Sequence, residues 1–99
     1  MLPLTYHKAA QRELCEAAVY YENQLPGLGN EFLNEIELAL AQIRDAPLRW
    51  PVIERERNVR RHLLRRFPYA IIYRVKTRAI RVLAFKHHAR EAGYWRRRL

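Results

Sequence analysis

Side chains that can transfer protons or bind anions gather near the C-terminus of the sequence. His87 is followed by Arg90, by Tyr94 and Trp95, and by Arg98. Histidine and tyrosine can act as acid or base in a reaction, and arginine holds a phosphate or a carboxylate through its forked donors. This group of residues is compatible with cleavage of a phosphodiester bond, and equally with simple binding of an anionic partner.

Charge is distributed unevenly between the two halves of the chain. Residues 1–47 hold three Lys or Arg against seven acidic residues, a net charge of −4, whereas residues 48–99 hold sixteen against three, a net charge of +13. The basic residues in segments that we expect to be strands include Arg61, Arg65, Arg66 and Arg74. The asymmetry indicates a polyanionic partner for the second half, either a nucleic acid or an acidic protein.

Several kinds of site and location are not supported by the sequence. Cys15 is the only cysteine, and His87 and His88 are neighbours whose side chains point to opposite faces of a strand, so we expect no metal site and no cofactor. No apolar run is long enough to span a bilayer, and the N-terminus does not resemble a signal peptide. We therefore expect a soluble cytoplasmic protein with no membrane partner.

The first half of the chain is expected to form a short strand and a helical hairpin. Residues 2–6 are an apolar segment, and after His7 apolar residues recur every three or four positions until Pro26 and Gly27. A second amphipathic pattern runs from Phe32 to about Ala46, where Pro47 disfavours further helix. Because the link is short, the two helices should lie antiparallel.

The second half is expected to form a sheet. Residues 47–58 are predicted to be an irregular connection in which Trp50 packs the loop onto the body of the protein. Residues 59–67, 69–76 and 80–87 are predicted to be strands, because they are rich in β-branched and aromatic residues. Ile80, Val82 and Ala84 should share one face of the last strand. Residues 89–99 should form a short tail, helical or extended.

These elements predict one α+β domain over residues 1–99, with the order β-α-α-β-β-β. The helical hairpin should pack on one face of a mainly antiparallel sheet.

Residues along the whole chain resemble those of the RelE/ParE toxin superfamily, and in particular its ParE-like branch of plasmid-stabilisation proteins. The resemblance rests on five groups of residues in order: Ala9-Ala10 to Tyr20-Tyr21-Glu22, Leu28-Gly29 with Phe32, Pro47 with Trp50-Pro51, Arg61 and Leu64 with Phe67-Pro68-Tyr69, Ile71 and Tyr73, and His87-x-x-Arg90 with Tyr94-Trp95 and Arg98. One departure is Ala92, at a position before the Tyr-Trp pair where a proline is often found.

The resemblance implies a toxin that is bound in a hetero-oligomeric complex by an acidic antitoxin. The complex would contact operator DNA only through the antitoxin. Free toxin would act on DNA gyrase, as ParE-like toxins do, or as an endoribonuclease that cleaves mRNA on the ribosome, as RelE-like toxins do. A more distant alternative is a non-toxic RNA-binding module, although the sequence has no motif of that class.

The position of one alanine favours the gyrase inhibitor. In RelE-like enzymes a catalytic arginine follows the aromatic residue that opens the middle strand, and here Ala70 follows Tyr69. If the chain were a nuclease, its catalytic residues would be drawn from Arg65, Arg66, His87, Arg90 and Tyr94.

For the favoured function we expect a set of target-binding residues: Arg61, Arg65, Arg74, His87, Arg90, Tyr94, Trp95 and Arg98. Within this set Trp95 should anchor the tail, while Arg90 and Arg98 should be exposed.

Overall fold

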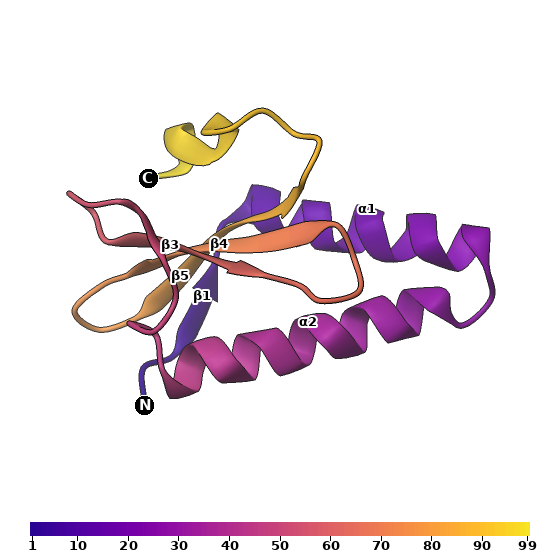
Figure 1. Ribbon diagram of the computed structural model, residues 1–99, viewed down its shortest axis with the longest axis horizontal. Helices are drawn as coiled ribbons and strands as arrows, with labels where there is room; N and C mark the ends of the chain where they lie inside the picture. Colours follow the sequence, from indigo (N-terminus) through magenta and orange to yellow (C-terminus); the bar gives the residue numbers. More distant parts are fainter.

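The computed structural model describes residues 1–99 and has a five-stranded sheet with two long helices (Figure 1). The elements in chain order are β1 (Leu4–Tyr6), α1 (Lys8–Gln24), α2 (Leu28–Asp45), β2 (Val52–Glu54), β3 (Val59–Leu63), β4 (Tyr69–Val75), β5 (Ile80–His87) and the 3-10 helix η1 (Tyr94–Arg98). The strands lie in the order β1-β5-β4-β3-β2, and only β1 is parallel to its neighbour. The α+β fold with a mainly antiparallel sheet is thus confirmed. No helix is long and apolar enough to cross a membrane.

Strand β2 was not expected, because it lies in the stretch predicted to be irregular. It is a three-residue edge strand in which Val52 pairs with Arg60 of β3. Pro47 and Pro51 are typical of an irregular segment, so the sequence pattern does not indicate so short a strand. The loop before it is held as predicted, since the Trp50 ring packs against His62 with their ring centroids 4.0 Å apart.

The helical hairpin is closed by backbone contacts at its turn. Gly27 has a left-handed backbone (φ +92°), and a Cβ atom on Gly29 would lie 2.7 Å from the backbone oxygen of Ala18 in α1. The Glu22 carboxylate accepts hydrogen bonds from the N–H groups of Gly27 and Gly29. Glycine at these two positions therefore lets the chain reverse and the helices approach closely.

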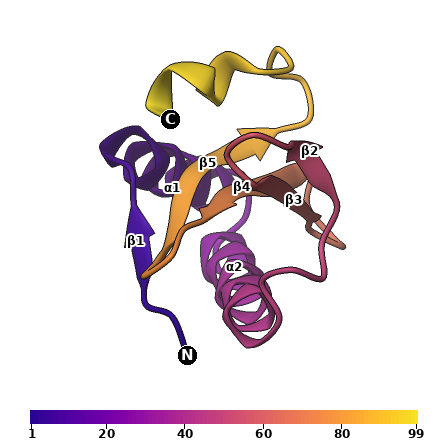
Figure 2. The same ribbon diagram turned by 90° about the vertical axis from the view of Figure 1, so that its left-hand side faces the viewer.

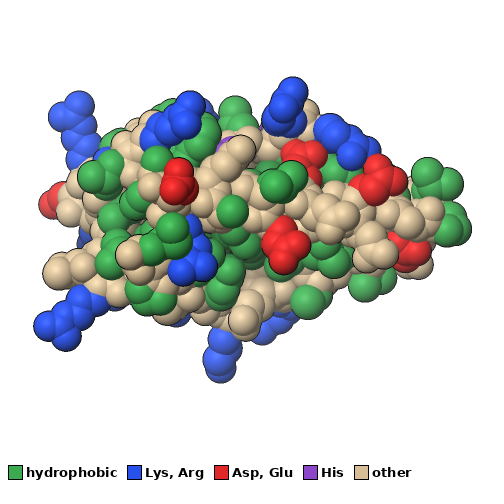
Figure 3. Space-filling model, turned by 90° about the horizontal axis from the view of Figure 1, so that it is seen from below, with side chains coloured by type: hydrophobic (Ala, Val, Ile, Leu, Met, Phe, Trp, Pro, Cys, Tyr) green, Lys and Arg blue, Asp and Glu red, His purple; other side chains and the backbone are tan.

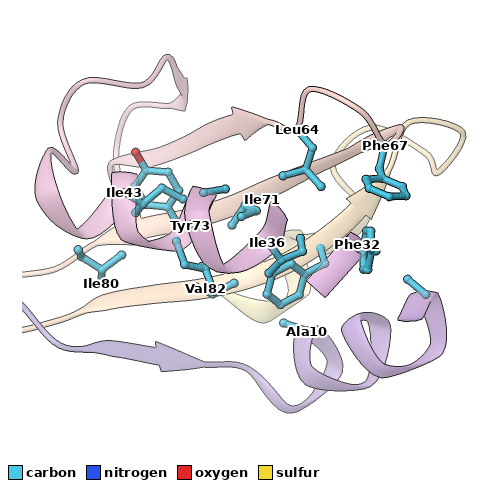
Figure 4. Close-up of a cluster of buried hydrophobic side chains, with 14 residues drawn as sticks. Ala10, Phe32, Ile36, Ile43, Leu64, Phe67, Ile71, Tyr73, Ile80 and Val82 are labelled. Atoms are coloured by element: carbon cyan, nitrogen blue, oxygen red, sulfur yellow. The ribbon is translucent and has the colours of Figure 1, made fainter. Parts of the chain in front are cut away.

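The main core lies between the hairpin and one face of the sheet (Figure 4). Phe32 and Ile36 of α2 pack there with Ile71 and Tyr73 of β4 and with Val82 of β5, and all five are buried. A smaller cluster covers the opposite face, where Trp95 of the tail packs on residues of β3, β4 and β5. Figure 2 shows the tail and α2 on opposite sides of the sheet. We call the face that the tail partly covers the open face.

A β-bulge in β5 corrects one prediction about the faces of the sheet. Ile72 pairs with Ala84 and the next residue, Tyr73, pairs with Val82, so Leu83 is the extra residue. Leu83 and Ala84 both belong to the open-face cluster, whereas Val82 and Phe85 belong to the main core. The expectation that Ala84 shares a face with Ile80 and Val82 is wrong, because strict alternation fails at a bulge.

Candidate functional site

The tail is fixed to the body by a largely buried carboxylate on α1. Glu13 receives two hydrogen bonds of 2.9 Å from the guanidinium of Arg98 and one of 2.7 Å from the hydroxyl of Tyr94. Both side chains of the Glu13–Arg98 ion pair are only 14% exposed. The expectation that Arg98 is an exposed charge is therefore wrong.

The same ion pair completes the edge of β5. Strand β1 covers this edge only as far as the pair Tyr6–Val82. Beyond that point Glu13 accepts the N–H of Phe85 (3.1 Å), and Arg98 donates to the carbonyl of Leu83 (2.9 Å). Two side chains thus satisfy backbone groups that would otherwise lack partners in the sheet.

The contacts of Glu13 shift the pKa values of its two side-chain donors. Burial, together with the hydrogen bond to Glu13, raises the pKa of Tyr94 far above its ordinary value. The hydrogen bond to Glu13 also raises the pKa of Arg98. Tyr94 therefore stays protonated and donates its hydrogen bond, and it cannot serve as a base near neutral pH.

His87, Arg90 and Tyr94 are brought together as the sequence indicated. They line a cavity of about 240 Å³ beside α1, with Tyr69 and Tyr20. The His87 ring lies edge-on to Tyr69, and its Nδ1 accepts the N–H of Ala89 at 2.9 Å. Arg90 is exposed, with its guanidinium 3.9 Å from the centroid of the Tyr94 ring. We call this place the His87 cavity.

Trp95 is separated from that group, although it is next to Tyr94 in sequence. It is buried on the open face of the sheet, only 3% exposed. The prediction that Trp95 anchors the tail is confirmed, and its burial leaves it little surface for a target.

Arg65 and Arg66 lie on the hairpin side of the molecule. The expected strand over residues 59–67 ends at Leu63, and the N–H groups of Arg65 and Arg66 donate to Glu35 of α2 instead of to a neighbouring strand. The Arg66 guanidinium pairs with Glu31 at 2.7 Å. These arginines line a different cavity from that of His87.

Arg61 and Arg74 extend from the open face. Arg74 donates to the backbone carbonyl of Arg57. Arg61 lines a cavity of about 460 Å³, which we call the open-face cavity. Its lining consists of Ile53, Arg61, Leu63, Ala70, Ile72, Lys86, His88, Ala92 and Arg96.

Three basic residues of the open-face cavity, Lys86, His88 and Arg96, are not among the target-binding residues predicted from the sequence. Strand alternation puts Lys86 and His88 on the opposite face from His87, and the bulge at Leu83 determines which face that is. The signal available in the sequence was the excess of basic residues after position 47, which does not show where they gather.

Comparison with protein families gives a match over residues 4–92 to the family described as ParE toxin of type II toxin-antitoxin system, parDE. The chain belongs to the ParE toxin family. The resemblance stated from the sequence is thereby confirmed.

A solved structure and a sequence comparison complete these findings. The fold is similar to that of a chain in the chromosomal ParDE toxin-antitoxin system from P. aeruginosa, with a TM-score of 0.76, 19% identity, and coverage of 88% of this chain and 96% of that one. At that identity the likeness establishes the fold of this ParE family member. No curated protein matches its sequence.

Proposed function

We propose that this ParE family toxin arrests growth by binding DNA gyrase, and that an acidic antitoxin neutralises it. The observation that carries the proposal is that two of the five candidate nuclease residues, Arg65 and Arg66, lie apart from the other three, which share the His87 cavity. Arg65 and Arg66 contact α2, whereas His87 lies in its own cavity beside α1. Acid, base and phosphate-binding cations must surround one scissile bond, so residues on separate surfaces cannot form one such site.

The position of Ala70 gives further support to a binding mechanism. Ala70 lies in the lining of the open-face cavity, where the related nucleases are expected to carry a catalytic arginine. Neither Arg65 nor Arg66 lines that cavity, so neither replaces the missing group. The residues of the His87 cavity then remain as a surface for a protein target.

The antitoxin proposal rests on charge. The open face presents Arg61, Lys86 and Arg96, none of which forms an ion pair within the chain. An acidic partner would neutralise this surface and would be attracted to it at long range. In this proposal the toxin and antitoxin form a hetero-oligomeric complex in the cytoplasm, and the antitoxin alone contacts operator DNA.

Two measurements test the mechanism, one with purified proteins and one on cells in which the chain is induced. Supercoiling by purified gyrase should fall as the toxin is added, and the proposed acidic antitoxin should restore it. Primer extension on cellular messages should show no new ends within codons. Cuts at the ribosomal A site, with gyrase unaffected, would contradict the proposal and would support the ribosome-dependent endoribonuclease.

A further inference from the structure

Four basic residues gather where the chain turns from β4 to β5, and they have no acidic partner. Neither ion pair of the chain includes any of them. We call them the turn cluster: Arg74, Lys76, Arg78 and Arg81. The last three line a cavity of about 450 Å³ that has no acidic lining residue. Cations that surround one cavity without carboxylates favour an anionic ligand.

Two of these arginines face each other across the sheet. Arg74 of β4 pairs directly with Arg81 of β5. The row continues with Val59 on β3 and Thr5 on β1, so no acidic residue beside the pair offsets its charge. Like charges that lie directly opposite on two antiparallel strands destabilise a sheet. Residues that break such a local rule of stability are characteristic of functional surfaces.

The turn adds uncharged donors of the kind that bind phosphate oxygens. The N–H groups of Thr77, Arg78 and Ala79 donate to no backbone acceptor of the chain. The side chains of Thr5 and Thr77 line the same cavity as the cations. Proteins contact the phosphates of nucleic acids through Lys, Arg, Ser and Thr side chains and through backbone N–H groups. The cavity therefore combines the classes of donor that bind a phosphodiester backbone.

We propose that the turn cluster binds the phosphate backbone of double-stranded DNA. This inference rests on the proposed function, in which the free toxin acts on gyrase, and the contact holds the toxin on the DNA that gyrase supercoils. The contact is independent of base sequence, so recognition of operator DNA still belongs to the antitoxin.

The lining of the cavity favours a duplex over other polyanions. Single-stranded RNA is commonly held by aromatic side chains on which its bases stack, and no aromatic residue lines this cavity. An acidic peptide segment would need apolar pockets as well as charge, and Ala79 is the only apolar lining residue. A duplex needs neither, because phosphates form its outer surface.

The position of the turn cluster leaves other surfaces free. The β4–β5 turn and the α1–α2 turn lie at opposite ends of the long axis (Figure 1), and basic side chains project from the β4–β5 end at the left of Figure 3. The first 47 residues, which include both helices, carry a net charge of −4 and would repel DNA. Arg81 and His87 lie near opposite ends of β5, about 20 Å apart at the rise of a strand. The toxin can therefore contact DNA and a protein target at the same time.

Binding of a short labelled duplex of mixed sequence to the purified chain, followed by fluorescence anisotropy, tests the turn cluster. Lys76→Gln/Arg78→Gln removes two charges from the exposed turn and should weaken binding by about tenfold or more at low salt. The slope of log affinity against log salt concentration should fall by about two, because each phosphate contact contributes about 0.9.

Arg12→Gln/Arg97→Gln is the matched control. It makes the same change in net charge at two exposed residues of α1 and η1 that do not line the cavity. It should weaken binding by less than about threefold and leave the salt slope unchanged. Equal weakening by the two double variants would overturn the proposal, because net charge alone would then explain the attraction. Tighter binding of an oligouridylate or of polyglutamate than of the duplex would also overturn it.

A third variant separates DNA binding from stability. Arg81→Glu places a carboxylate opposite Arg74, so it should raise the melting temperature while it weakens binding of the duplex by about tenfold or more. A purely structural role of Arg81 would move stability and binding in the same direction. Loss of both, or unchanged binding, would overturn the proposal.

A gyrase assay separates this proposal from the proposed function. Lys76→Gln/Arg78→Gln should require about tenfold more protein than the wild type to inhibit supercoiling. If the wild type inhibits gyrase but binds no duplex DNA, the proposed function stands and the DNA contact is wrong. If the wild type binds DNA through the turn cluster and leaves supercoiling unaffected, the DNA contact stands and the proposed function is wrong.

Discussion

Glu13 and Arg98 together occupy the edge of β5 that β1 leaves uncovered. They are 85 positions apart in sequence, and their paired side chains satisfy the N–H of Phe85 and the carbonyl of Leu83. The tail is therefore joined to the edge of the sheet through the side chain of Arg98, and its arginines have different roles.

Arg98→Ala should destabilise the fold much more than Arg90→Ala. Removal of Arg98 leaves the carboxylate of Glu13 buried without its counter-ion, which should lower the free energy of unfolding by about 3 kcal/mol. Arg90 is exposed and contributes only a contact with the Tyr94 ring. Its loss should therefore lower the free energy of unfolding by about 0.5 kcal/mol. Urea denaturation of the two variants measures the difference, and equal midpoints would contradict the structural role of Arg98.

If the His87 cavity binds the target, as we propose, Arg90→Ala should lose toxicity while it keeps its fold. Arg97→Ala is the control, because Arg97 is an exposed arginine of the same tail and lines neither cavity. We expect cells that express the Arg97 variant to stop growing and those that express the Arg90 variant to continue, at equal protein levels. Full toxicity of Arg90→Ala would show that the target contacts another surface.

The two glycines of the hairpin turn should respond differently to alanine. In Gly29→Ala the new methyl group would lie 2.7 Å from the Ala18 oxygen, so the helices must separate. At Gly27 a Cβ atom would meet no neighbour. The only cost of Gly27→Ala is the strain of holding an alanine in the left-handed backbone conformation, about 1 kcal/mol. Thermal unfolding should therefore show a larger loss for Gly29→Ala than for Gly27→Ala. The reverse order would contradict the close packing of α1 on α2.

Tyr73 should make the protein sensitive to alkaline pH. Its hydroxyl donates to the carbonyl of Pro47 at 2.7 Å, and burial raises its pKa from 10.0 to about 12. The folded state therefore holds this proton more tightly than the unfolded state, so the contribution to stability is complete below pH 10 and is lost as the pH rises to about 12.

Tyr73→Phe isolates this contribution from that of the other tyrosines. At pH 7 it should lower the free energy of unfolding by about 1 kcal/mol, through the lost hydrogen bond. Between pH 10 and pH 12 the wild type should lose more stability than the variant. Parallel pH profiles in chemical denaturation would contradict the assignment.

Local patterns predicted the helices and most strands of this protein, because their residues repeat with the periods of an amphipathic helix or a strand. They could not predict the bulge at Leu83, because it depends on how β5 pairs with β4. The incorrect prediction that Ala84 shares a face with Val82 matters for function, because the bulge also determines on which face of the sheet His87 and Lys86 lie.

The role of Glu13 was hidden for a similar reason. On the helix pattern it is one acidic residue among several off the apolar stripe, and only the folded tail reveals that Arg98 and Tyr94 surround it. Burial of a charge depends on partners distant in the sequence. The family resemblance, in contrast, is carried by residue identities along the whole chain and did not require these contacts.

The most direct test of the central claim is the count of viable cells after induction of this chain, with and without co-expression of the proposed acidic antitoxin. The account predicts that colony counts fall when the chain is induced alone and are restored by co-expression. Unchanged counts with the chain alone, at a confirmed level of folded protein, would contradict it.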